Sequence, residues 1–256
     1  MTGGSTPTPP NGPGRSDEIR RSELVAALGA VRSRISEACA AAGRATSSVT
    51  LVAVTKTYPA SDVLTLAELG VADVGESRDQ EAHAKVDQVS AAGFAGLRWH
   101  FLGRLQRNKA KAVAGYAGAV HSVDRAELVP LLAAGVEQAL ERTGRPVLEI
   151  FVQVSLDGDP GRGGALPEQI GHIADAVASS ARLRLRGLMA VAPLGAEPDE
   201  AFERLELLAT TLRTDHPDAD ALSAGMSHDM EAALRHGATH LRIGTALLGR
   251  RTQIFG

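Results

Sequence analysis

The sequence predicts an α/β protein, a (β/α)8 TIM barrel preceded by one N-terminal helix, on the strength of three observations. Short apolar runs alternate with helical patterns along most of the chain. Eight such runs can be counted, and eight parallel strands close a barrel. No G-x-G-x-x-G follows the first run, although an open doubly wound sheet usually carries that nucleotide fingerprint. The open sheet is the alternative, and the missing fingerprint favours the barrel.

The first fifteen residues are almost entirely Gly, Pro, Ser, Thr and Asn. They offer nothing to bury, so we expect residues 1–15 to be a disordered segment and residues 16–256 to form a single domain. A helix is predicted to begin at Ser16 and to end at Gly43. Its apolar stripe, which must dock on the rest of the protein, consists of Leu24, Leu28, Val31, Ile35 and Ala42.

The elements that follow are identified from apolar runs and from helix-start signals. The predicted strands are Thr50–Thr55, Ala72–Val74, Arg98–Leu102, Ala119–Ser122, Leu148–Val154, Leu185–Met189, Ala221–Leu222 and His240–Ile243. The predicted helix starts are Ser61-Asp62, Asp124 with Glu127, Pro167-Glu168, Pro198-Asp199 and Ser227.

Composition limits the classes of function. The hydrophobic fraction of 44% contains only 3% aromatic residues, which predicts an aliphatic core. A net charge of -3 argues against a nucleic-acid binder, because affinity for the phosphate backbone needs clustered cations. The basic stretch 104–111 is therefore interpreted as the solvated start of a helix.

The only cysteine is Cys39, which excludes an intramolecular disulfide and a thiolate metal cluster and fits a reducing compartment. His236 and His240 are four residues apart, but Gly237 interrupts the helix that would bring them to one face, so no metal site is expected. No apolar stretch is long enough to span a membrane, and no signal peptide is recognisable. We expect a cytoplasmic protein without contact to membranes.

Lys56 ends the first predicted strand in a chain that uses arginine for nearly all of its positive charge. Only four of the 27 basic residues are lysine, so 23 are arginine. A Schiff base to a carbonyl needs a primary amine, which arginine cannot supply. Because the active site of a barrel lies at the carboxyl ends of its strands, we expect Lys56 to point into the mouth. Lys85, Lys109 and Lys111 are attributed to chance.

Two turns after the seventh and eighth strands have the composition of an anion site. Ser223–Glu231 contains a glycine turn followed by Ser227, interpreted as the cap of the next helix. Arg242–Ala246 places Gly244 and Thr245 at the start of another short helix. In barrels these loops often bind phosphate, and helix N-termini favour anions. A phosphorylated aldehyde or ketone is thus the expected ligand, either pyridoxal 5′-phosphate or a sugar phosphate.

Seven segments, in this order along the chain, carry a family resemblance. They are Leu51–Lys56, Gly75-Glu76-Ser77, Trp99–Gly103 with Leu105-Gln106 and Asn108-Lys109, His121–Asp124, Leu185–Met189, Gly225–Glu231 and Arg242–Thr245. Together they resemble the pyridoxal phosphate homeostasis protein family, whose members are relatives of the barrel domain of alanine racemase. The resemblance covers roughly residues 22–250 and implies a barrel of the alanine racemase N-terminal domain type.

The resemblance also implies roles for single residues. Lys56 would form the internal aldimine with pyridoxal 5′-phosphate, and Arg242 would lie near the pyridine nitrogen and keep it unprotonated. The phosphate would be held by Ser227, Gly244 and Thr245, with Met226 beside them. Ser77 stands where the family usually has asparagine, so that contact is altered here. Apart from the resemblance, His100 stands at the end of the third predicted strand and is expected either to line the mouth and contact the cofactor or to be a structural histidine whose hydrogen bonds are satisfied within the protein.

The function expected from this resemblance is storage or delivery of the cofactor in pyridoxal phosphate homeostasis. Alanine racemase needs a second catalytic base from a separate β domain, and this chain stops at Gly256, after its last barrel helix. Of the two tyrosines, Tyr58 is interpreted as a loop packing residue, and Tyr116 is not assigned. A weak amino-acid racemase and a Schiff-base aldolase remain the alternatives. The expected partners are pyridoxal 5′-phosphate and its apoenzymes, and the expected state is a monomer.

Overall fold

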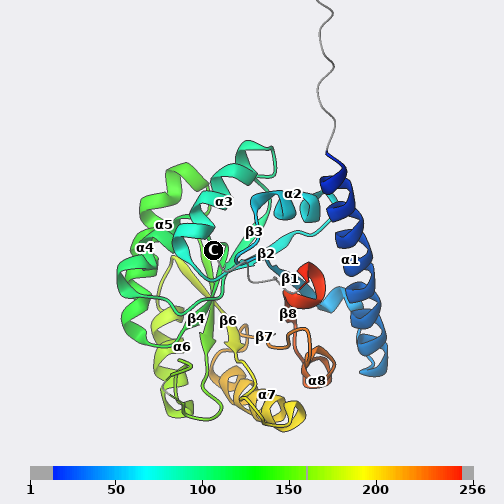
Figure 1. Cartoon of the computed structure of the whole chain (residues 1–256). Helices are drawn as coiled ribbons and strands as arrows, with labels where there is room; N and C mark the ends of the chain where they lie inside the picture. Colours follow the sequence, from blue (N-terminus) through cyan, green and yellow to red (C-terminus); the bar gives the residue numbers. More distant parts are fainter. Residues whose placement is uncertain (1–13, 160, 250–256) are drawn as a thin grey trace, which may run out of the picture.

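The computed structural model describes residues 14–159 and 161–249, which form a closed barrel of eight parallel strands (Figure 1). Each strand pairs with the next along the chain, and β8 pairs with β1. The strands are β1 Thr50–Val54, β2 Asp73–Glu76, β3 Arg98–Phe101, β4 Ala119–Val123, β5 Leu148–Gln153, β6 Leu183–Met189, β7 Ala221–Ser223 and β8 His240–Ile243. The predicted fold class is confirmed, and all eight predicted strands are found with their ends shifted by at most two residues.

Helices surround this barrel on the outside (Figure 1). They are α1 Arg15–Ala41, α2 Ala60–Glu68, α3 Asp79–Ala91, α4 Ala110–Tyr116, α5 Val129–Thr143, α6 Ile170–Ala178, α7 Pro198–Asp215, α8 Met230–Arg235 and α9 Thr245–Leu248. The predicted start at Pro198 is confirmed, because proline suits the first turn of a helix. The predicted starts at Asp124 and Ser227 are wrong, since α5 begins at Val129 after a 3-10 turn and α8 begins at Met230.

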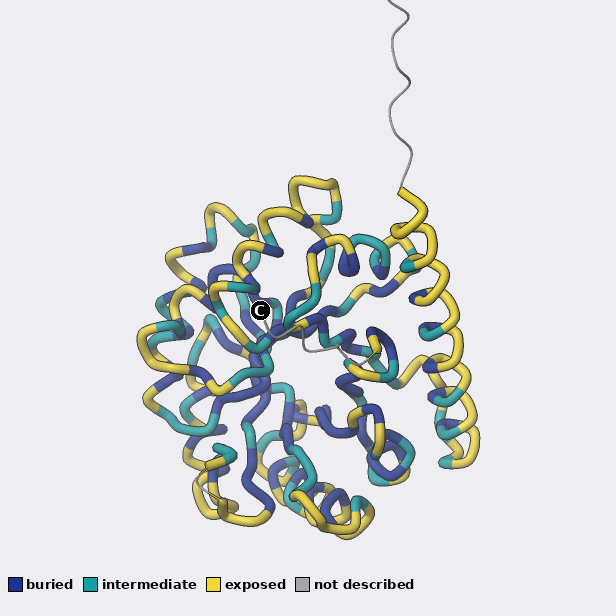
Figure 2. The backbone as a smooth tube through the Cα atoms, viewed as in Figure 1, coloured by how far each residue is buried: buried dark blue, intermediate teal, exposed yellow. Residues whose placement is uncertain are grey.

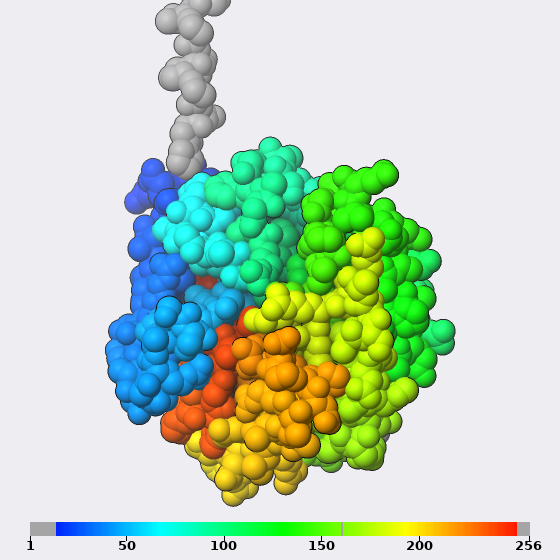
Figure 3. Space-filling model, turned by 180° about the vertical axis from the view of Figure 1, so that it is seen from behind, coloured from blue at the N-terminus to red at the C-terminus, as the bar shows by residue number. Residues whose placement is uncertain are grey.

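The first helix completes the outer layer beside the last strand. It begins at Arg15, one residue before the predicted start, and residues 1–13 of the predicted disordered segment lie outside the described residues. Its buried stripe is Leu24, Leu28, Val31, Ile35 and Cys39, so the predicted stripe is correct except for Ala42. The helix packs on α8 and α9. Figure 3 shows the same closure from the opposite side, where the red C-terminal part lies between blue and orange segments.

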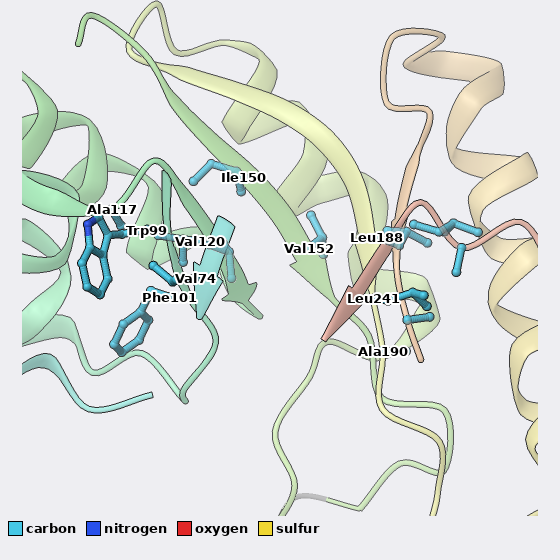
Figure 4. Close-up of a cluster of buried hydrophobic side chains, with 14 of the residues drawn as sticks. Val74, Trp99, Phe101, Ala117, Val120, Ile150, Val152, Leu188, Ala190 and Leu241 are labelled. Atoms are coloured by element: carbon cyan, nitrogen blue, oxygen red, sulfur yellow. The ribbon is translucent and has the colours of Figure 1, made fainter. Parts of the chain in front are cut away.

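An aliphatic layer lies between the strands and the helices. Figure 2 shows buried strands inside and exposed outer helix faces. The side chains in Figure 4 that fill this layer, all buried, include Val74 of β2, Val120 of β4 and Leu188 of β6. Alternate residues of these strands therefore face the helices, as expected for a barrel whose strands are buried on both faces. No helix within residues 14–159 and 161–249 has the length and apolar character to cross a membrane.

The inside of the barrel departs from the predicted aliphatic core. Three histidines, His100, His121 and His240, meet there around Phe151, whose ring lies 4.2 Å from that of His121 and 5.0 Å from that of His240. All four residues are at least 95% buried. Short inward residues such as Ala119 and Ala221 leave the space for these rings. The interior is thus aromatic and polar, whereas the layer outside the strands is aliphatic.

The docking of α1 generates a stability prediction. Leu28 is 2% exposed and Val25 is 48% exposed on the same helix. Leu28→Ala removes buried methyl groups and is expected to lower the free energy of unfolding by about 2–5 kcal/mol. Val25→Ala is the matched control and should change it by less than about 0.5 kcal/mol. Urea denaturation followed by circular dichroism measures both, and equal effects would contradict a docked first helix.

Candidate functional site

Lys56 lies at the carboxyl end of β1, at the mouth of the barrel. Val52 of β1 is in register with Arg242 of β8, and residues in register on neighbouring strands face the same side of the sheet. Arg242 points inward, so Val52 and Val54 also face the interior. Lys56 lies two residues beyond Val54, in the turn that follows the strand, and is exposed. The structure therefore places a residue with a primary amine at the carboxyl end of β1, as the sequence predicts.

A buried ionic cluster lies behind Lys56. The ammonium of Lys85 on α3 donates to the carbonyl oxygen of Thr55 at 2.7 Å, to Glu76 Oε1 at 2.8 Å and to Glu81 Oε1 at 2.9 Å. The hydroxyl of Thr55 donates to Glu76 Oε1 at 2.7 Å. Lys85 is 5% exposed, so its attribution to chance is wrong. The cluster joins the end of β2 and the first half of α3 to the loop that carries Lys56.

The two loops predicted to bind an anion lie together beyond β7 and β8. The backbone N–H of Ala246 donates to Ser227 Oγ at 3.1 Å, and the backbone N–H of Arg242 donates to the Gly225 carbonyl at 2.9 Å. Gly225 has φ 88°, and a Cβ there would lie 2.7 Å from the Cβ of Ala233. Only glycine fits this left-handed, crowded position. The turn thereby brings Ser227 against the loop of Gly244 and Thr245.

The anion site depends less on helix dipoles than the sequence predicts. Ser227 lies in a turn three residues before α8 and does not cap it, and α9 has only four residues. Two such short helices contribute little macrodipole. The hydroxyls remain suited to an anion: Ser227 Oγ accepts from Ala246, which leaves its own hydrogen available to a ligand, and Thr245 is exposed. Met226 lies next to them and is 37% exposed.

The first helix braces both loops from outside. The guanidinium of Arg34 donates to the Ser227 carbonyl at 3.2 Å and pairs with Glu231 at 2.7 Å. Arg20 donates to the Leu248 carbonyl at 3.1 Å. The hydroxyl of Tyr58 donates to the Gly249 carbonyl at 2.7 Å and so ties the Lys56 loop to the end of α9. Tyr58 packs in its loop, as the sequence predicts.

Arg242 begins a hydrogen-bonded chain that runs through the barrel. Its Nη1 donates to Ser223 Oγ at 2.6 Å, and Ser223 Oγ lies 2.8 Å from His121 Nδ1. His121 Nε2 lies 2.8 Å from His100 Nδ1, and His100 Nε2 lies 2.9 Å from Asp73 Oδ1. The chain therefore links the mouth to the first residue of β2 at the opposite end of the barrel.

The two ends of this chain limit how its hydrogens can be arranged. The carboxylate of Asp73 can only accept, so His100 Nε2 donates to it. The guanidinium of Arg242 can only donate, so the Ser223 hydroxyl oxygen accepts from it. Between these ends, His121 bonds His100 through Nε2 and Ser223 through Nδ1. Burial lowers the pKa of His121 well below its usual value, so this histidine is neutral and donates through only one of its two nitrogens.

Arg242 keeps donors for a ligand. Its Nη2 also donates to the Ala190 carbonyl at 2.8 Å, so two of the five guanidinium N–H groups are bonded within the described chain. Burial lowers the pKa of Arg242 to about 10, which still leaves the side chain charged at neutral pH. The arginine is thus a fixed cation whose remaining N–H groups can meet an acceptor.

The structure places His100 and Ser77 differently with respect to the mouth of the barrel. His100 does not line the mouth: its side chain is fully buried inside the barrel, and both ring nitrogens are hydrogen-bonded to protein groups. Ser77 follows β2 and is half-buried, and its carbonyl oxygen lies so near Gly103 that a Cβ there would approach it to 2.1 Å. Sequence reasoning missed His121, Ser223 and Asp73, although His121 sits in a quoted segment.

Comparisons with known proteins agree with this geometry. The model of the alanine racemase N-terminal domain family matches residues 27–252. The pyridoxal phosphate homeostasis protein of Mycobacterium tuberculosis (strain ATCC 25618 / H37Rv) is 46% identical over 243 residues, which cover 91% of this chain and 94% of that protein. The protein of the same name from Escherichia coli (strain K12) is 37% identical over 227 residues, with 88% and 95% covered.

A solved structure shows the same fold. PipY of Synechococcus elongatus PCC7942, with PLP bound, has a TM-score of 0.71 and 32% sequence identity to this chain. The similarity covers 84% of this chain and 100% of PipY. The barrel fold described above is therefore similar to that of a protein whose structure contains PLP.

The buried histidines generate a prediction about pH. Burial lowers the pKa of His240 to about 3, and the neighbouring His100 adds to the shift. In the unfolded chain His240 binds a proton as the pH falls through about 6.5, whereas in the folded chain it stays neutral down to about pH 3. The contribution of His240 to the free energy of unfolding is therefore fully present above about pH 6.5 and is lost as the pH falls below that value. Between about pH 7 and about pH 5 the free energy of unfolding should fall by about 2 kcal/mol because of His240 alone.

Urea denaturation at both pH values checks this contribution. His240→Leu is expected to remove about 2 kcal/mol of the pH dependence, whatever its effect at neutral pH. His172 is exposed on α6, so His172→Gln is the matched control and should leave the pH dependence unchanged. The same slope in both variants would show that His240 is not held neutral.

Proposed function

The chain belongs to the pyridoxal phosphate homeostasis protein family, with the barrel of the alanine racemase N-terminal domain, and we propose that it holds pyridoxal 5′-phosphate on Lys56 for storage and delivery. The single observation that carries the proposal is the exposed Lys56 amine at the same barrel mouth as the paired loops of Ser227 and Thr245. One group suits an aldehyde and the other suits a phosphate.

Lys56 supplies the covalent link. Its primary amine condenses with an aldehyde to a Schiff base and releases one water, and the reverse reaction returns the free amine. A reversible bond suits a protein that must release what it binds. Lys85 does not compete for this role, because its ammonium is buried and bonded to three oxygens.

The phosphate is proposed to lie at the loops after β7 and β8. Ser227 and Thr245 offer hydroxyl hydrogens, and Gly244 lets a ligand approach the backbone closely. Met226 would cover the group from the side that is exposed to solvent. The guanidinium of Arg34 lies behind this loop, where it bonds the Ser227 carbonyl and keeps the turn in place.

Arg242 fits the remaining part of the cofactor, the pyridine nitrogen. Its free N–H groups can only donate, so they match an unprotonated ring nitrogen and disfavour a protonated one. The hydrogen-bonded chain to Asp73 fixes the guanidinium in this orientation. An unprotonated ring is a weaker electron sink, which favours holding the cofactor over transforming amino acids on it.

The delivery role extends to partners and compartment. The exposed amine at an open mouth is accessible to an acceptor protein, so PLP-dependent apoenzymes are the proposed recipients. Cys39 is a free thiol on the buried face of α1, which is compatible with the reducing cytoplasm. We expect the protein to act there as a monomer, and analytical ultracentrifugation tests that state.

The cofactor link is tested on purified protein incubated with pyridoxal 5′-phosphate. The wild type should gain an absorbance band near ~420 nm that borohydride abolishes, because a Schiff base absorbs there and is reducible. Mass spectrometry of the digested product should find the pyridoxyl group on the peptide containing Lys56. Lys56→Arg keeps the positive charge without a primary amine and should lose band and adduct.

Two further measurements complete this test. Lys111→Met, on the exposed surface of α4, is the matched control and should behave like the wild type. The loaded wild type should then reactivate an apoenzyme, with little α-proton exchange of amino acids in deuterated water. A colourless wild type would overturn the cofactor link, and rapid proton exchange would replace storage by racemase-like catalysis.

The phosphate loop is tested separately by Ser227→Ala. This change removes one hydrogen bond to a charged group, which is worth about 1.5–3 kcal/mol. The dissociation constant of pyridoxal 5′-phosphate should therefore rise by about tenfold or more, while that of unphosphorylated pyridoxal stays the same. Equal losses for both compounds, measured by titration of the absorbance band, would argue against a phosphate at Ser227.

A further inference from the structure

We propose that Lys85 and Glu81 are positioning residues for Lys56, which they hold by fixing the backbone on both of its sides. The inference rests on the proposed function, because it takes Lys56 as the amine that binds the aldehyde. It adds a role for two residues on α3 that do not belong to the barrel strands. Neither residue is needed for the fold of a barrel as such, since other charged or apolar residues can dock a helix.

On the N-terminal side of Lys56, the contact is with Thr55. The Lys85 ammonium lies 2.7 Å from the Thr55 carbonyl oxygen, which belongs to the peptide group that joins Thr55 to Lys56. The Thr55 hydroxyl is bonded to Glu76 Oε1 at 2.7 Å, so the carbonyl and the hydroxyl of this residue are both held by the cluster. Thr55 is fully buried, and Lys56 is the first exposed residue after it.

On the C-terminal side, the contact is with Thr57. Its backbone N–H donates to Glu81 Oε1, the same oxygen that accepts from Lys85 at 2.9 Å. Thr57 has φ 68° and is the one residue other than glycine with a positive φ among residues 14–159 and 161–249. A β-branched residue in this region costs on the order of 1–2 kcal/mol, so an interaction must hold it there. The bond to Glu81 contributes to that interaction, together with the Tyr58 N–H, which donates to the Thr55 carbonyl at 3.1 Å and closes the turn around Lys56 and Thr57.

The chemistry of the cluster explains why lysine is used at position 85. Glu76 is 1% exposed, and burial raises its pKa despite the bonds from Lys85 and Thr55. Its other oxygen, Oε2, has no hydrogen-bond partner within the described chain. A second carboxylate, Glu81, lies on the same ammonium. One compact cation with three donors therefore bridges two carboxylates and a carbonyl, which the forked guanidinium of arginine matches less well.

These contacts favour a role in positioning over a merely structural one. A helix that needed only to dock would be anchored to the strand body, as α3 is through its buried Ala82 and Val89. Lys85 and Glu81 instead bond the residues directly before and after Lys56. A shift of this loop moves the amine relative to the anion loops, and a displacement of about 1 Å can cost about a hundredfold in rate.

The test compares covalent and non-covalent binding in Glu81→Gln and Lys85→Met. The rate at which Lys56 gains the borohydride-trapped pyridoxyl adduct should fall by about tenfold or more in both variants. Affinity for pyridoxine 5′-phosphate, which has the phosphate and ring but no aldehyde, should stay within about twofold, because its contacts do not involve the amine. Lys111→Met is the control and should match the wild type in both assays.

Each outcome decides the proposal. Lys85→Met leaves Glu76 without its cation and can unfold the protein, so Glu81→Gln, at a residue whose side chain is 25% exposed, carries the test in that case. An unchanged trapping rate in folded Glu81→Gln overturns the positioning role. A parallel loss of analogue affinity overturns it as well, since that is the mark of general disruption. A wild type that binds the analogue without an adduct at Lys56 overturns the proposed function itself.

Discussion

The hydrogen-bonded chain from Asp73 to Arg242 is the constraint on which the interior of this barrel depends. An acceptor-only carboxylate at one end and a donor-only guanidinium at the other fix the outer hydrogen bonds, and His100, His121 and Ser223 are bonded to one another between them. A buried polar group without a partner is costly, so each member requires the next. The chain crosses from β2 through β3, β4 and β7 to β8. It therefore links strands that hydrogen-bond only to their neighbours.

Closure of the barrel then brings the two halves of the site together. Lys56 and Gly244 are far apart in sequence, but β1 pairs with β8, and a Cβ at Gly244 would lie 3.4 Å from that of Val54. The amine and the anion loops are thus neighbours because the first and last strands are neighbours. Two separate polar systems support them: the ionic cluster of Lys85 lies outside the barrel wall, and the histidine chain lies inside it.

The sequence predicted the barrel well, because each predicted strand is a short apolar run and each of these runs forms a strand in the structure. Lys56 and Ser227 could also be identified from the sequence, since an amine at a strand end and a hydroxyl after a glycine are local signals. The roles of His121 and Lys85 could not be predicted, because they depend on partners 102 and 30 residues away in sequence. His100 was misplaced at the mouth for a related reason: a strand end does not reveal which side chains the interior hydrogen bonds will turn inward.

The bracing of the anion loops by α1 has a consequence for biosynthesis. Arg20 is synthesised 228 residues before the Leu248 carbonyl that it binds, and Arg34 is synthesised 193 residues before the Ser227 carbonyl. Strand β1 likewise waits for β8 before its outer edge is paired. The nascent chain must therefore keep an amphipathic helix and an open strand edge protected until β8 has been synthesised. The amine and the loops after β7 and β8 can come together only after that point.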